Sequence, residues 1–174
     1  MFRVVLIPFF VFFMLSEHIA YHNYIAVAIF IVASLTDMLD GKIARKYNLV
    51  SNFGKFMDPL ADKLLVSSAM ICFVALPSIP MPAWVVIVII AREFIISGFR
   101  LVASDAGVVI AASYWGKIKT VTQMIMSILL IVNFDGYIIN IVEYVFIYAA
   151  LILTVISLVD YMVKNWSVMR DGNM

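Results

Sequence analysis

Charged side chains are scarce in this chain, and their scarcity excludes most soluble folds. Only 13% of the 174 residues are Asp, Glu, Lys or Arg, whereas 65% are hydrophobic. A soluble domain of this length needs more polar surface to cover its core. The composition therefore predicts an all-α protein that lies in a lipid bilayer.

Cysteine and clusters of basic residues are also rare. Cys72 is the single cysteine, so an intrachain disulfide is excluded. The formal net charge is +1 and no dense run of Lys and Arg occurs. Nucleic-acid binding needs such a basic patch, so we expect no nucleic-acid partner.

Long apolar stretches remain once the polar residues are set aside, and they predict six transmembrane helices. The expected spans cover residues 4–20, 24–46, 52–76, 82–104, 107–133 and 138–163. A helix needs about 20 residues to cross a bilayer, and only the first stretch is short of that. Its apolar run follows Arg3 and contains Pro8, which also resembles a signal peptide. Five further hydrophobic segments favour a signal-anchor or a true first helix.

The polar breaks between the spans predict the topology. Residues 16–23, 76–82 and 133–140 contain acids or prolines but no Lys or Arg, and all twelve basic residues lie towards the other ends. The positive-inside rule then places both termini and the loops after the second and fourth spans in the cytoplasm. No repeat or linker interrupts the chain, so residues 1–174 are expected to form one multi-pass domain.

Several charged residues lie within the predicted spans rather than in the loops. They are Asp37, Asp62, Lys63, Arg92 and Glu93. A charged side chain at the centre of a membrane helix costs about 2.5 to 3.5 kcal/mol on insertion scales. Exposure of these charged side chains to lipid would therefore be strongly unfavourable. They are therefore expected to face one another, a water-filled cavity or bound ions.

The spacing of four aspartates predicts a metal site. Asp37, Asp40, Gly41 and Ala44 lie at i, i+3, i+4 and i+7 in the second span, and Gly54, Asp58 and Asp62 lie at i, i+4 and i+8 in the third. Each set shares one helix face. Four ionised carboxylates repel one another, and oxygen ligands select hard cations, so one or two Mg²⁺ or Mn²⁺ ions are expected as cofactor. The small residues beside them leave room for a nucleotide or a pyrophosphate.

The same residues resemble the signature of a known enzyme family. From Asp37 to Asp62 the spacing is D-x2-D-G-x2-A-R-x8-G-x3-D-x3-D, with Arg45 as the fifth fixed residue. This is similar to the CDP-alcohol phosphotransferase signature at all eight fixed positions. The resemblance implies a six-span, usually dimeric enzyme that moves a phosphate-linked lipid group from a CDP-linked donor to an alcohol and releases CMP.

The resemblance also assigns a role to each residue of the signature. Asp37, Asp40 and Asp58 match the three aspartates that hold two divalent ions on the donor pyrophosphate. Asp62 matches the fourth aspartate, which completes the metal site and is the proposed base for the acceptor hydroxyl. The residues implied to contact the CDP donor are Gly41, Ala44, Arg45 and Gly54.

Three further segments resemble the branch of this family that makes phosphatidylglycerophosphate in bacteria. They are residues 52–63, 91–100 and 116–120. This resemblance implies CDP-diacylglycerol as donor and glycerol 3-phosphate as acceptor, at the cytoplasmic face of the cytoplasmic membrane. That branch carries a short polar segment before its first span, which is missing here, so a truncated start is an open alternative.

A surplus of cations near the predicted site favours an anionic acceptor. The candidates for its phosphate are Arg92, Arg100, Lys117 and Lys119. Arg92 is the first candidate and one of the two lysines is the second. The lysines are about 200° apart around a helix, so they are not expected to reach one ligand together. Glu93 lies nearly in phase with Arg100, and an ion pair between them is the alternative for that arginine.

Other functions remain open at this point. Within the family, the acceptor could be that of a cardiolipin synthase or a phosphatidylinositol-phosphate synthase. UbiA-like prenyltransferases also use intramembrane aspartates, but they have about nine spans and lack the D-G-x2-A-R continuation. A cation transporter would show broken helices or inverted repeats, and the sequence shows neither.

Overall fold

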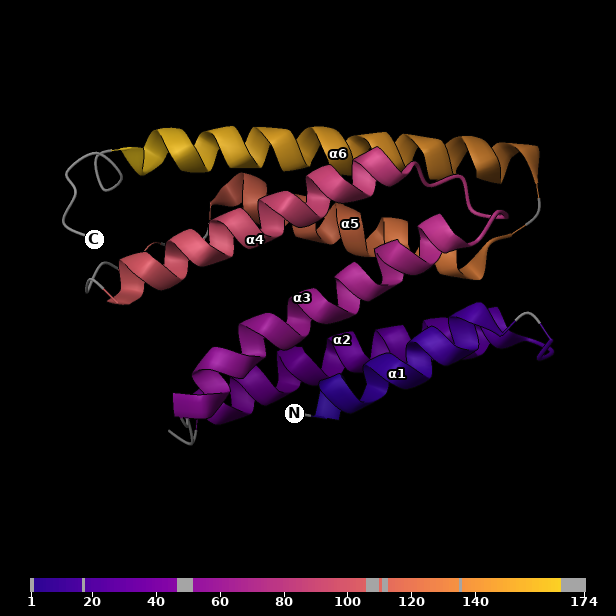
Figure 1. The fold of residues 1–174 in the computed structure, drawn as a ribbon, viewed down its shortest axis with the longest axis horizontal. Helices are drawn as coiled ribbons and strands as arrows, with labels where there is room; N and C mark the ends of the chain where they lie inside the picture. Colours follow the sequence, from indigo (N-terminus) through magenta and orange to yellow (C-terminus); the bar gives the residue numbers. More distant parts are fainter. Residues whose placement is uncertain are drawn as a thin grey trace. The chain divides into compact units, whose positions relative to one another are not determined.

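The computed structural model describes the backbone of residues 2–16, 18–46, 52–105, 110, 113–134 and 136–166. Within these ranges, the side chains of residues 2–3, 37–46, 52–62 and 105 are not described. The described residues form six α-helices and contain no strand (Figure 1). The predicted all-α fold is therefore confirmed.

The six helices follow the six apolar stretches in order. They are α1 (Phe2–Leu15), α2 (His22–Lys46), α3 (Asn52–Ala75), α4 (Ala83–Asp105), α5 (Tyr114–Val132) and α6 (Tyr137–Lys164). Proline sets the break between α3 and α4, where Pro77, Pro80 and Pro82 cannot donate helical hydrogen bonds. After α5, Asn133 takes a left-handed backbone with φ of 49°, which ends the helix.

Two predicted boundaries are wrong, and local hydrogen bonds explain both. The first helix ends at Leu15 rather than at residue 20. There the Ile19 amide donates to the Ser16 carbonyl at 3.2 Å, which is a turn rather than a helical hydrogen bond, and Tyr21 turns the chain with φ of 62°. The fifth helix begins at Tyr114 rather than at residue 107. The Ser113 hydroxyl accepts a hydrogen bond from the Gly116 amide at 3.1 Å, which is the geometry of an N-terminal cap.

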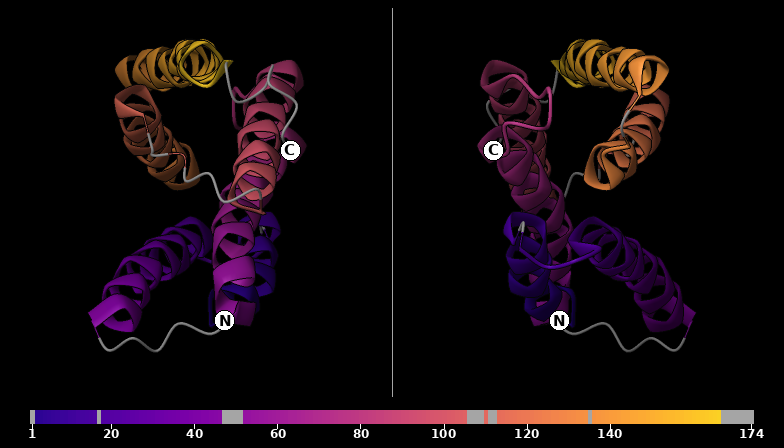
Figure 2. Two further views of the ribbon diagram at one scale, coloured as in Figure 1. Left: turned by 90° about the vertical axis from the view of Figure 1, so that its left-hand side faces the viewer. Right: turned by 90° about the vertical axis from the view of Figure 1, so that its right-hand side faces the viewer.

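The chain divides into two compact units. The first runs to Pro80 and includes Ser127–Asp135. In it, α1 packs against both α2 and α3, and α2 also contacts α3 (Figure 2). Phe10 of α1 and Phe30 of α2 are fully buried, with ring centroids 5.8 Å apart. Small and flexible apolar side chains, such as Ala69 and Met70, complete this core.

The second unit contains α4, α6 and α5 as far as Met126. Helix α6 packs along α4, and its buried residues recur at steps of three and four. These buried residues are Glu143, Ile147, Ala150, Thr154, Ser157 and Tyr161. Phe99 of α4 meets the Tyr161 ring edge to face, with centroids 5.7 Å apart. The contact fixes the two helices against each other near their carboxyl ends.

Helix direction alternates within each unit, as the charge pattern predicts. In the first unit, the start of α1, the end of α2 and the start of α3 lie at one end (Figure 1). In the second unit, the end of α4, the start of α5 and the end of α6 lie at one end. In both units these ends carry most of the basic residues.

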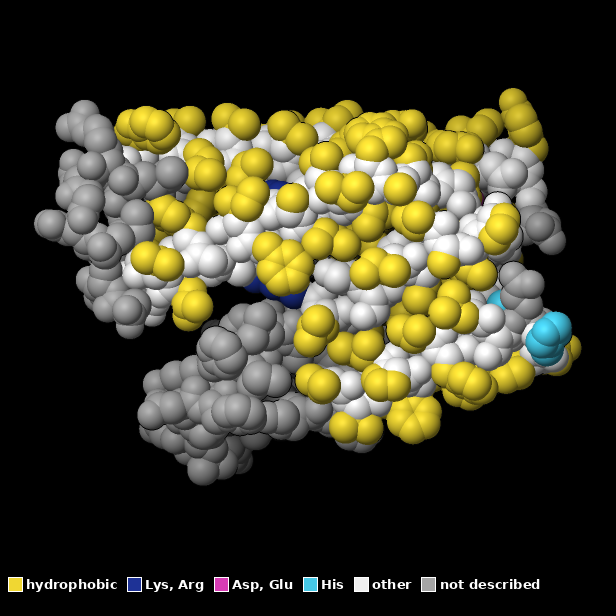
Figure 3. Space-filling view, viewed as in Figure 1, with side chains coloured by type: hydrophobic (Ala, Val, Ile, Leu, Met, Phe, Trp, Pro, Cys, Tyr) yellow, Lys and Arg dark blue, Asp and Glu magenta, His cyan; other side chains and the backbone are white. Residues whose placement is uncertain are grey.

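The described surface is largely apolar. Hydrophobic side chains cover much of the coloured surface of both units in Figure 3. Large hydrophobic side chains of both units are exposed, and Phe9 is 55% exposed, Ile87 66% and Val163 71%. Among the described residues, α5 and α6 are long and apolar enough to cross a membrane. The six-span arrangement and the single domain stay predictions.

Candidate active site

The eight signature residues lie on two helices that contact each other. Asp37 and Asp40 lie in the last turns of α2, and Asp58 and Asp62 lie in the first half of α3. The backbone is helical through both segments, so the spacings that predict a shared face apply to real helices. The side chains of all eight lie outside the described residues. The predicted metal and donor roles therefore stay predictions, including those of Gly41, Ala44, Arg45 and Gly54.

The predicted acceptor residues are described, and two of them meet at one carboxylate. Arg92 of α4 donates from Nη1 to Oε1 of Glu93 at 3.2 Å. Lys119 of α5 donates from Nζ to the same oxygen. The Lys119 side chain is 1% exposed and the Arg92 side chain 10%. Two buried cations thus share one carboxylate.

One edge of the Arg92 guanidinium faces the start of α5. A Cβ atom added to Gly116 would lie 3.6 Å from Arg92 Nη2 and 3.4 Å from the Ser113 hydroxyl. The glycine therefore leaves a methyl-sized space beside the guanidinium. Arg92 Nε is buried without a hydrogen-bond partner in the described part of the chain. The amide groups at a helix N-terminus carry partial positive charge, so this corner attracts anions.

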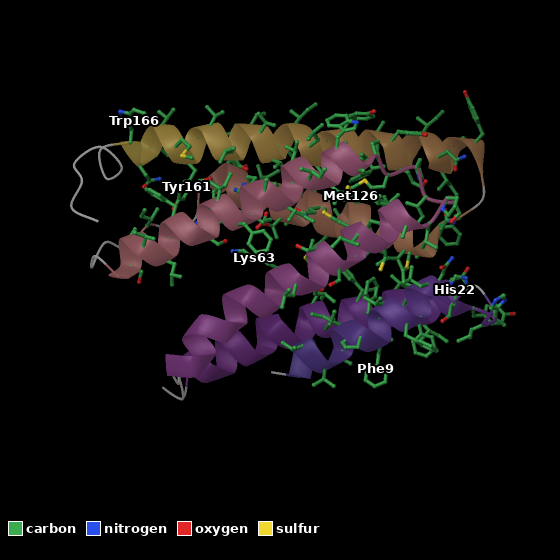
Figure 4. The ribbon with its side chains drawn as sticks, in the orientation of Figure 1. Phe9, His22, Lys63, Met126, Tyr161 and Trp166 are labelled. Carbon is green, nitrogen blue, oxygen red and sulfur yellow. The ribbon has the colours of Figure 1, made fainter. Side chains whose placement is uncertain are left out.

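Arg100 takes a different environment, on the side of α4 that meets α6. Its guanidinium carbon lies 5.6 Å from the centre of the Tyr161 ring, which is cation–π geometry. Figure 4 labels Tyr161 on the side of α6 that faces α4. The hydroxyl of Tyr161 is buried without a hydrogen-bond partner among the described residues. Arg100 therefore helps to join α4 to α6.

The two lysines at the start of α5 have opposite environments. Lys119 is buried at Glu93, whereas Lys117 is exposed. The exposed position makes Lys117 the weaker of the two candidates for a buried phosphate. At the end of α6, the exposed Lys164 pairs with Asp160 at 2.7 Å, as structural ion pairs one helical turn apart commonly do.

Sequence reasoning missed three of these features. It gave Glu93 no role with Arg92 or Lys119, because the partner on α5 lies 26 residues away. It did not select Ser113 and Gly116, because the fifth helix was expected to begin earlier. Serine is a preferred residue directly before a helix, and Ser113 could have corrected that boundary.

Comparison with known proteins decides the family. A family model described as CDP-alcohol phosphatidyltransferase matches residues 1–156. The chain belongs to this family. The resemblance drawn from the aspartate signature is thereby confirmed, and the prenyltransferase and cation-transporter alternatives lose their support.

Curated relatives of this family member cover most of its length. One from Bacillus subtilis, named CDP-diacylglycerol--glycerol-3-phosphate 3-phosphatidyltransferase, is 44% identical over 98% of this chain and 94% of its own. A protein of the same name from Haemophilus influenzae is 40% identical over 92% of this chain and 87% of its own. A probable phosphatidylglycerophosphate synthase from Mycobacterium tuberculosis is 37% identical over 93% of this chain and 77% of its own. Two candidate membrane-spanning helices and this family together indicate a membrane-bound transferase of phospholipid biosynthesis.

Proposed function

We propose that the chain transfers a phosphatidyl group from CDP-diacylglycerol to glycerol 3-phosphate, which gives phosphatidylglycerol phosphate and CMP. The observation that carries the proposal is the similarity over nearly the whole chain to relatives that bear the name of this reaction. The full aspartate signature and the buried cations of α4 and α5 support it independently.

The donor site is assigned to the first unit. Asp37, Asp40 and Asp58 supply oxygen ligands from two helices that contact each other, and this donor set fits hard divalent cations such as Mg²⁺ or Mn²⁺. Two ions would neutralise the donor pyrophosphate and make its phosphorus more electrophilic. Gly41, Ala44, Arg45 and Gly54 are assigned to the CDP part of the donor.

The transfer itself is a substitution at phosphorus. A free hydroxyl of glycerol 3-phosphate attacks the phosphatidyl phosphorus and forms a new P–O ester bond. The bond from that phosphorus to the bridging oxygen of the pyrophosphate breaks, and its electron pair leaves with CMP. Asp62, the fourth aspartate of the signature, accepts the hydroxyl proton. Such reactions are accelerated mainly by positioning and by charge neutralisation.

The acceptor phosphate is assigned to the second unit. A phosphate monoester carries between one and two negative charges near neutral pH, so it needs cations that are held in place. Arg92 and Lys119 are buried, and Glu93 holds both in place. Planar guanidinium groups bind phosphate oxygens in pairs, which favours Arg92 as the direct contact. Arg100 and the exposed Lys117 are the remaining candidates.

The proposal includes the membrane arrangement and the assembly. The apolar surface and the alternating helix direction within each unit favour six spans with the basic ends in the cytoplasm. CDP-diacylglycerol places its acyl chains in the bilayer and its nucleotide in water, so a site at the cytoplasmic ends of the helices suits it. The family resemblance adds a homodimer to this proposal.

An acceptor panel tests the proposal. Purified protein receives CDP-diacylglycerol, Mg²⁺ and one alcohol at a time, namely glycerol 3-phosphate, phosphatidylglycerol, inositol phosphate or serine, and CMP release is measured. We expect release above background only with glycerol 3-phosphate. Release only with phosphatidylglycerol would indicate a cardiolipin synthase, and release only with inositol phosphate would indicate a phosphatidylinositol-phosphate synthase. Either result would overturn the proposed acceptor.

A further inference from the structure

Glu93 holds together two cations that come from different helices. Its Oε1 accepts a hydrogen bond from Arg92 Nη1 at 3.2 Å and another from Lys119 Nζ. One cation lies on α4 and the other on α5, and their side chains are at most 10% exposed. A buried arginine and a buried lysine at one site repel each other, because the protein screens charge less than water does. The carboxylate offsets that repulsion.

The same hydrogen bond fixes the direction of the guanidinium. The guanidinium group of Arg92 is planar and rigid, so the hydrogen bond from Nη1 to Glu93 determines where its other nitrogens lie. Nη2 then lies 3.6 Å from the point that a Gly116 Cβ would occupy. Without Glu93, rotation about the side-chain torsions would move this edge away from Gly116.

We propose that Glu93 is a positioning residue for recognition of the acceptor phosphate. It holds Arg92 and Lys119 so that the Nη2 edge of Arg92 faces the space beside Gly116, where a phosphate oxygen binds. This inference rests on the proposed function, because the anion is the phosphate of the acceptor. Glu93 itself does not touch the substrate, since like charges would repel.

Glu93→Gln tests the proposal because it keeps the size of the side chain and removes its charge. We expect the KM for glycerol 3-phosphate to rise roughly tenfold, the scale of one charge-assisted hydrogen bond lost to misalignment, with little change in kcat or in the KM for CDP-diacylglycerol. Glu93→Asp keeps the charge and should recover part of the loss. Because the Gln variant adds net positive charge, a purely electrostatic role would instead lower the KM.

Glu143→Gln is the matched control. Glu143 lies on α6 of the same unit and is 1% exposed, and its Oε1 has no hydrogen-bond partner in the described part of the chain. The substitution is the same exchange of Glu for Gln, in a side chain that is less exposed than that of Glu93, which is 20% exposed. It should leave the KM for glycerol 3-phosphate within about twofold of the wild type, since no charged acceptor contact is lost.

The outcomes separate this proposal from the proposed function. If wild-type protein releases no CMP with glycerol 3-phosphate, the proposed function fails. If wild-type protein is active but Glu93→Gln leaves the acceptor KM unchanged or lowers it, positioning by Glu93 is refuted. A fall in kcat together with similar rises in both KM values and a lower melting temperature would show that Glu93 is merely structural. That result would also refute positioning by Glu93.

Discussion

Gly116→Ala should make the protein more stable and yet weaken its use of glycerol 3-phosphate. Gly116 is the third residue of α5, where alanine is the better helix former by about 0.5 to 1 kcal/mol. The added Cβ would meet the Ser113 hydroxyl at 3.4 Å and Arg92 Nη2 at 3.6 Å, which are ordinary contact distances. The folded chain can therefore accept the methyl group.

The same methyl group would fill the space that we assign to a phosphate oxygen. Loss of one charge-assisted hydrogen bond in a partly desolvated site costs about 1.5 to 3 kcal/mol, or roughly ten- to a hundredfold in KM. We expect the KM for glycerol 3-phosphate to rise by about that factor, while the KM for CDP-diacylglycerol stays the same. Initial rates of CMP release at varied acceptor concentration give both values.

Gly98→Ala is the control for helix propensity. Gly98 lies on α4, and an added Cβ there meets nothing within 4 Å. This variant should gain stability in the same way and keep the wild-type KM for both substrates. If Gly116→Ala also keeps the wild-type acceptor KM, no phosphate oxygen lies between Gly116 and Arg92, and the assigned acceptor site is wrong.

Four further tests have expected results. Arg92→Ala should raise the KM for glycerol 3-phosphate roughly ten- to a hundredfold with little effect on that for the lipid donor; an unchanged value in a folded variant would move the phosphate site to Arg100. Lys117→Ala, at an exposed position, should change the acceptor KM less than Lys119→Ala does, and the reverse order would reassign the lysine. Excess chelator should abolish CMP release, because the ionised carboxylates cannot bind a pyrophosphate without cations. Asp62→Asn should lower the single-turnover rate by about 10² to 10⁴ with near-normal donor binding, whereas an equal fall in donor binding would make Asp62 chiefly a metal ligand.

The helices could be predicted from the sequence because apolar length and proline breaks are local signals. Both boundary errors come from apolar residues outside the helix. Ile19 and Ala20 extend the first apolar run beyond Leu15, where a turn from Ser16 to Ile19 and the left-handed Tyr21 redirect the chain. Ile110, which is described and is not helical, likewise extends the fifth run beyond the start of α5. Hydropathy does not distinguish such residues from helical ones, whereas capping hydrogen bonds do.

The candidate site, too, could be predicted only where its signal lies within a single helix. The aspartate positions follow from spacing within α2 and within α3, which a sequence displays directly. The group formed by Arg92, Glu93 and Lys119 depends on how α4 lies against α5, and no spacing within one helix encodes that. Phase around a single helix suggested Arg100 as the partner of Glu93. The cation–π contact of Arg100 with Tyr161 depends in turn on the packing of α6.

The most direct test of the proposed reaction is its product stoichiometry. Purified protein is given CDP-diacylglycerol, Mg²⁺ and isotopically labelled glycerol 3-phosphate, and the lipid extract and the released CMP are quantified together by mass spectrometry. We expect one labelled phosphatidylglycerol phosphate for each CMP released, and neither product when chelator is in excess. Release of CMP without label in the lipid, or label in the lipid without CMP, would contradict the proposed reaction.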